Sequence, residues 1–75
     1  MEAYVLINLK EPSEQQILEE LESVKGVEEA HILFGEWDLI LKLSLESPEA
    51  IGSFVIEQIR SRDDVNLTST LIVAK

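Results

Sequence analysis

The pattern of apolar and polar residues along the chain predicts four β-strands. Residues 3–9 are rich in β-branched and aromatic side chains, which are typical of strands. Residues 27–34 and 37–45 predict two further strands, and the strict alternation over 37–45 indicates a strand with one buried face. The short turn at residues 35–36 joins these two strands in a hairpin. Residues 65–74 form the last predicted strand.

Apolar residues that recur at helical spacing predict two helices. The first covers residues 13–24, with Ser13 as its N-cap, Gln16 completing a capping box, and Gly26 where a helix commonly ends. The second begins at Ser47, which is followed by proline and glutamate, residues favoured in the first helical turn. Its apolar stripe consists of Ile51, Phe54, Val55 and Ile59.

The predicted elements follow each other in the order β-α-β-β-α-β. Because β-α-β crossovers are right-handed, this order predicts a ferredoxin-like α+β fold, with a four-stranded antiparallel sheet and both helices on one face. No linker interrupts the pattern, so we expect residues 1–75 to form a single domain. A chain of 75 residues buries a small core, which favours oligomerisation as a source of stability.

The sheet face without helices is a predicted interface between two subunits. Alternation in the last strand places Leu67, Leu71 and Val73 on the helix side. The open face is then both too apolar for water and too polar for a second core layer, which favours packing on another subunit. The alternative is a solvated sheet with scattered apolar residues. The residues predicted on the open face are Tyr4, Leu6, Asn8, Ile40, Lys42, Thr68, Thr70 and Ile72.

Composition and charge exclude several classes of function. The formal net charge is −9, which argues against direct binding of nucleic acid and against an electrostatic membrane anchor. The chain has no cysteine, which excludes disulfides, zinc fingers, iron–sulfur clusters and thiol catalysis. No apolar run approaches the ~18 residues that a membrane span needs. The N-terminus lacks the basic start of a signal peptide, so we expect a cytoplasmic protein.

Few side chains suggest chemistry, and no catalytic, metal or cofactor site is predicted. His31 is the only histidine, and the sequence favours an exposed strand residue over a general base or metal ligand. Adjacent acid pairs are typical of a solvated surface, and no glycine-rich phosphate loop is present.

Two features remain as candidates. One is the hairpin from Gly35 to Asp38, which is either a ligand-binding turn or a plain turn capped by Asp38. The other is the run from Thr68 to Thr70. Either its hydroxyls bind a polar ligand, or these are simply edge-strand residues of high β-propensity.

Four segments in this order and spacing resemble the ligand-binding (RAM) domain of the Lrp/AsnC transcriptional regulators. The glycine-to-aspartate hairpin followed by an alternating strand is the most specific of them. The resemblance implies dimers packed through the open sheet face, a further assembly into octamers or decamers, and an amino-acid effector bound between subunits. The matching segments are Ala3–Ile7, Val24–Ala30, Phe34–Lys42 and Thr68–Val73.

The resemblance also implies roles for individual residues. The backbone from Gly35 through Glu36 to Trp37 would hold the effector carboxylate, and Asp38 would bind its ammonium group or order the loop. Thr68 and Thr70 would contribute hydroxyls from a neighbouring subunit. Trp37 is bulkier than the tyrosine expected there, so the pocket is reshaped. The family's N-terminal helix-turn-helix is absent, so we expect a stand-alone domain that acts alone or by mixed assembly with full-length regulators.

The resulting hypothesis is a non-enzymatic module that binds an amino acid and controls assembly, in the context of transcriptional regulation. A second hypothesis is a cofactor-free monooxygenase of the dimeric α/β-barrel type, for which Asn8, His31 and Trp37 are the only candidate residues. A third is a purely structural oligomerisation module without a ligand.

Overall fold

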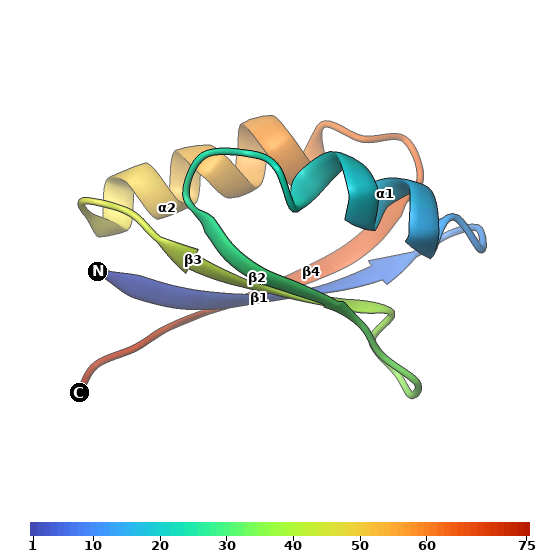
Figure 1. The fold of residues 1–75 in the computed structure, drawn as a ribbon, viewed down its shortest axis with the longest axis horizontal. Coiled ribbons are helices and arrows are strands. Elements are labelled where there is room, and N and C mark those ends of the chain that lie inside the picture. The colour runs from blue at the N-terminus through green and yellow to red at the C-terminus, as the bar shows by residue number, and fades with distance from the viewer.

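A computed structural model describes all of residues 1–75 (Figure 1). The order of elements confirms the predicted β-α-β-β-α-β arrangement, and the second helix continues into a π-helical segment, η1. The first helix is shorter than predicted, and a connection over residues 33–38 separates the second and third strands. The elements are β1 (Glu2–Leu9), α1 (Glu14–Leu21), β2 (Val27–Ile32), β3 (Leu39–Ser44), α2 (Pro48–Phe54), η1 (Val55–Arg60) and β4 (Val65–Ile72).

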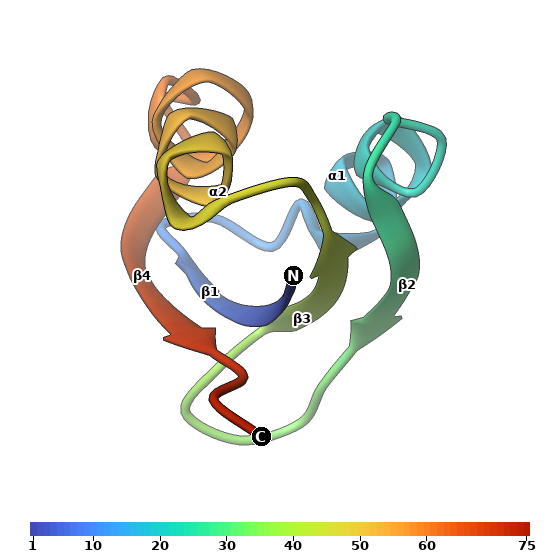
Figure 2. The ribbon, with the colours of Figure 1, turned by 90° about the vertical axis from the view of Figure 1, so that its left-hand side faces the viewer.

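The strands form one antiparallel sheet in the order β2-β3-β1-β4, and both helices cover the same face of it (Figure 2). The central strands β1 and β3 alternate between fully buried and more accessible residues, as predicted. The whole apolar stripe predicted for the second helix is buried against them. The core consists of Ala3, Val5, Ile7, Ile17, Leu21, Leu39, Leu41, Leu43, Ile51, Phe54, Val55 and Ile59.

Only one of the two predicted helix caps forms. Ser47 accepts a hydrogen bond from the Ala50 backbone N–H at 3.1 Å, as expected of an N-cap. Ser13 makes no such bond, so the predicted capping box is wrong. Its hydroxyl instead donates to the Asp64 carboxylate at 3.2 Å, and Gln16 donates to Glu20. Ser13 therefore joins the loop before α1 to the loop before β4.

The edge strand β4 contains one residue more than β1 opposite it. Asn8 pairs with Leu67, whereas the next residue of β1, Leu9, pairs with Val65. Asn66 is therefore the extra residue of a β-bulge, and the side chains on either side of it do not alternate regularly. Val65 packs against the core as an inward-facing residue should.

The bulge reverses the predicted faces of β4 for the rest of the strand. Thr68, Thr70 and Ile72 pair with the buried inward residues of β1, so they lie on the helix side. Leu67 and Leu71 lie on the open face instead. The predicted placement of the threonines on the open face is therefore wrong. A single unbroken alternation over 65–74 cannot reveal an inserted residue, because a shift of one position exchanges the two faces.

An ion pair links α1 to the turn after η1 and is expected to make stability pH-dependent. Arg62 donates to Glu20 at 2.7 Å, and this bond, aided by one from Gln16, lowers the pKa of Glu20 below its usual value. Because the folded-state pKa is depressed, the stabilisation is present above the unfolded carboxyl pKa of about 4.3 and is lost as pH falls through the folded pKa.

Lowering pH from about 7 to about 3 should therefore destabilise the wild type more than the Glu20→Gln variant. Urea denaturation at the two pH values measures this difference. Glu19→Gln is the matched control, since Glu19 is hydrogen-bonded to Gln15 alone and should retain the wild-type pH dependence. Equal pH dependence of wild type and Glu20→Gln would contradict the prediction.

Candidate functional site

The connection between β2 and β3 is held to the end of β1 by Asp38. One carboxylate oxygen, Oδ2, accepts hydrogen bonds from the Leu9 backbone N–H at 2.7 Å and from the Asn8 side chain at 3.4 Å. The Asp38 backbone N–H donates to the Ile7 carbonyl at 2.8 Å. Asp38 thus orders the hairpin, and its other oxygen, Oδ1, takes no part in these bonds. A role for Asp38 toward an ammonium group stays a prediction.

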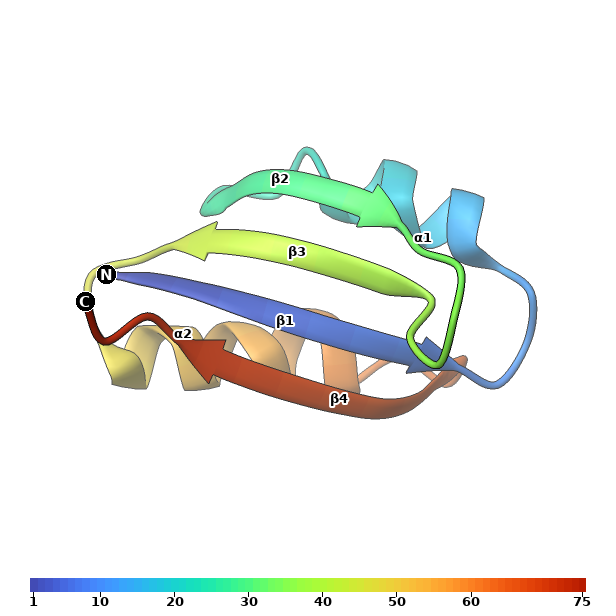
Figure 3. The ribbon, with the colours of Figure 1, turned by 90° about the horizontal axis from the view of Figure 1, so that it is seen from below.

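Two asparagines that the sequence did not single out for this site extend the network to β4. The Asn8 amide donates to the Glu36 carbonyl at 3.0 Å, and Asn66 donates to the Asn8 amide oxygen at 2.8 Å. The connection runs across the end of β1 toward β4 before it returns to β3 (Figure 3). Asn66 reaches Asn8 because it is the bulge residue, and no sequence pattern indicated that bulge.

The tip of the hairpin is open to solvent. Gly35 has a φ of +139°, a conformation that side-chain-bearing residues rarely adopt, and no atom lies within 4 Å of the position a Cβ would take. Backbone groups here are therefore accessible to another molecule. Phe34 is fully exposed at 105%, whereas Trp37 is partly buried. The Phe34 side chain is therefore accessible beside the open backbone of Gly35.

The predicted site residues fall on two sides of the sheet. Asp38 lies with Asn8 on the open side, whereas Thr68 and Thr70 lie on the helix side of β4. Thr68 is partly buried and Thr70 is exposed. A single chain therefore does not bring the carboxylate and the two hydroxyls together, and a site that uses all three requires residues from two chains.

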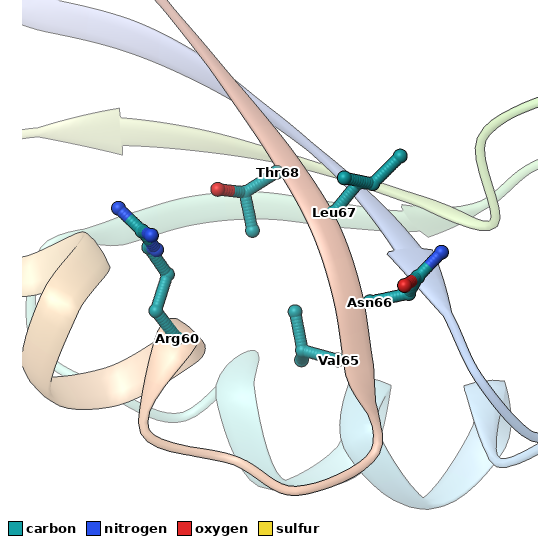
Figure 4. A pocket seen from close by; sticks show the side chains of 5 residues that line it. All are labelled: Arg60, Val65, Asn66, Leu67 and Thr68. Atoms are coloured by element: carbon teal, nitrogen blue, oxygen red, sulfur yellow. The ribbon is translucent and has the colours of Figure 1, made fainter.

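A groove of about 320 Å³ lies between η1 and β4. The side chains of Arg60, Val65 and Thr68 point toward this space, whereas Asn66 and Leu67 point to the other side of the strand (Figure 4). Thr68 reaches this groove because the bulge turns its side chain to the helix side of β4. The groove has the size of a small-molecule site and combines one cation, one hydroxyl and one valine side chain.

The open sheet face carries a row of accessible apolar side chains. Leu67 and Leu71 are 59% and 53% exposed. Tyr4 of β1, which pairs with Lys42 of β3 and with Leu71 of β4, is 37% exposed. Leu6 and Ile40 continue the row and are partly buried. This face is more apolar than the sequence indicated, because the bulge replaces threonines with leucines there.

A second bulge concentrates charge at one edge of this face. Lys42 pairs with Glu29, and the extra residue Glu28 in β2 lets both glutamates contact Lys42, at 3.9 and 4.0 Å. Glu2 lies 3.7 Å away. Chiefly the Glu2 carboxylate, then Tyr4 and the two β2 glutamates, raise the pKa of Lys42 above its ordinary value. Lys42 therefore stays charged among these acids at neutral pH.

The remaining candidates do not form a cluster. His31 is exposed and contacts Glu29 at 3.3 Å, and no hydrogen bond connects it to Asn8 or Trp37. No group of three or more histidine, cysteine or acidic side chains is arranged to hold a metal ion. Neither helix has the length and apolar character needed to cross a membrane.

Comparison with known proteins identifies relatives over nearly the whole chain. A family model described as the Lrp/AsnC ligand binding domain matches residues 2–75. A protein named as an uncharacterized HTH-type transcriptional regulator of Pyrococcus abyssi is 36% identical over 73 residues, which are 93% of this chain, and the chain spans only 49% of that regulator's length. The crystal structure of FFRP-DM1 is 30% identical with a TM-score of 0.89 and 96% coverage of both chains. The structure of E. coli AsnC is 29% identical with a TM-score of 0.89, over 99% of this chain and 50% of that chain.

Proposed function

This chain belongs to the Lrp/AsnC ligand-binding domain family, and we propose that it binds an amino-acid effector between subunits and thereby changes its state of assembly. The family is regulatory and non-enzymatic and is linked to effector-controlled transcription, which decides against the monooxygenase alternative. An effector shifts assembly when it binds one arrangement of subunits better than another. The observation that carries the proposal is the anchored, solvent-open hairpin on one side of the sheet and the threonines on the other.

The proposed site combines the hairpin of one chain with β4 of a neighbour. The backbone from Gly35 to Trp37 binds the effector carboxylate, and Oδ1 of Asp38 binds its ammonium group. Thr68 and Thr70 of the neighbouring chain contribute hydroxyls. The open tip of the hairpin and the placement of the threonines on the far side of β4 support this division between two chains.

The proposed assembly starts from a homodimer and continues to an octamer or decamer. The accessible apolar row on the open face supports the dimer, because it is an uncovered surface next to the core strands. Full-length regulators of the same family are further proposed partners through the same face. Membership of a transcription-regulator family favours action inside the cell, in the cytoplasm.

Light scattering on a gel-filtration column, with and without a mixture of the twenty amino acids, tests the proposed function. The expected result is a mass of eight or ten chains that shifts when the mixture is present, and fractionating the mixture then identifies the effector. A large assembly that ignores every amino acid would support a purely structural module instead. A monomer would contradict both the dimer face and the shared site.

A further inference from the structure

We propose that Arg60 makes the groove between η1 and β4 selective for an effector with a second carboxylate, that is, an acidic amino acid. The inference rests on the proposed function, since it assigns the side-chain end of the same site. Arg60 points into the groove from η1, and Thr68 and Val65 point into it from β4 (Figure 4). None of the proposed contacts to the amino-acid backbone of the effector uses this arginine.

The guanidinium of Arg60 has no partner within the chain. The ion pairs of the protein involve His31, Lys42 and Arg62, and Arg60 takes part in none of them and in no side-chain hydrogen bond. Arg60 is exposed, so its guanidinium is accessible to an anion that enters the groove. A guanidinium binds a carboxylate through two parallel hydrogen bonds, which a neutral side chain cannot reproduce.

Binding of an acidic effector to this chain depends on a positive group at the site. The net charge of −9 repels anions, so an acidic effector needs a specific positive group at its site. Thr68 adds a hydroxyl donor from β4. A neutral effector would cover Arg60 without supplying a counter-charge, which costs binding energy and discriminates against it. The groove therefore both attracts a carboxylate and disfavours apolar side chains.

Isothermal titration calorimetry with isosteric acid–amide pairs tests the inference. The titrants are L-glutamate against L-glutamine and L-aspartate against L-asparagine, with L-leucine as an apolar reference. We expect the wild type to bind one acid at least about tenfold more tightly than its amide, and this preference to weaken with added salt. Arg60→Gln should remove the preference and leave amide binding within about twofold, because the amide makes no ion pair.

Lys25→Gln is the matched control. It also changes the net charge by one, from −9 to −10, but Lys25 lies in the turn before β2, away from the groove. This variant should keep the preference for the acid. Equal binding of acid and amide by the wild type, or an unchanged preference in Arg60→Gln, would overturn the inference while leaving the proposed function intact. Absence of binding by any amino acid would overturn both.

Discussion

Replacing Leu71 with glutamate (Leu71→Glu) is expected to leave the chain folded and to dissociate the proposed dimer into monomers. Leu71 is 53% exposed and lies on the open face beside Tyr4, so the substitution removes little from the core of a single chain. In the dimer the new carboxylate would lie within an apolar contact, where burying an unpaired charge costs several kcal/mol. Dimer affinity should fall by at least about a hundredfold.

The charges already present on the open face add to the expected loss of dimer affinity. Lys42 is already held by Glu2, Glu28 and Glu29, so it is not free to neutralise the new charge. Light scattering across a range of protein concentrations measures the dimer, and circular dichroism measures the fold. Ile56→Glu is the matched control, because Ile56 is 61% exposed on η1, which packs on the other face of the sheet. A dimer that survives Leu71→Glu would show that the open face is not the contact.

The parts of the fold that follow regular periodicity could be predicted from the sequence. The stripe on α2 and η1 and the alternation in β1 and β3 were predicted correctly, because buried residues there recur at constant intervals. The faces of β4 were predicted wrongly, because the bulge at Asn66 inserts one residue without a composition signal. Ser13 forms no side-chain cap, and its hydroxyl donates to Asp64, which is distant in sequence. Local patterns do not report such tertiary partners.

In the candidate site, too, local contacts could be predicted from the sequence and long-range contacts could not. Asp38 was predicted because an aspartate after a glycine turn has a local role, and its hydrogen bonds to Leu9 and Asn8 are consistent with that role. The link from Asn8 to Asn66 joins residues 58 positions apart and depends on the bulge. The place of Arg60 opposite Thr68 follows from the packing of η1 against β4 rather than from spacing in the sequence.

The Asp38→Ala and Asp38→Asn variants should separate the structural role of this residue from its proposed role toward the effector. Alanine removes the acceptor of both hydrogen bonds and leaves the Leu9 N–H without its partner, which should lower the free energy of unfolding by about 1–3 kcal/mol. Asparagine keeps a side-chain oxygen that can accept from Leu9, so it should recover much of this loss. Urea denaturation of both variants measures the difference.

Effector binding should behave differently from stability in the same two variants. The proposed contact of Oδ1 with an ammonium group needs the negative charge, and charge-assisted hydrogen bonds are about twice as strong as neutral ones. Both variants should therefore lose the effector response of the assembly, although the alanine variant should unfold more readily than the asparagine variant. Glu46→Gln removes one charge at the other end of β3 and should change neither property. If Asp38→Asn responds to the effector as the wild type does, Asp38 acts only by ordering the hairpin, and the ammonium must bind elsewhere.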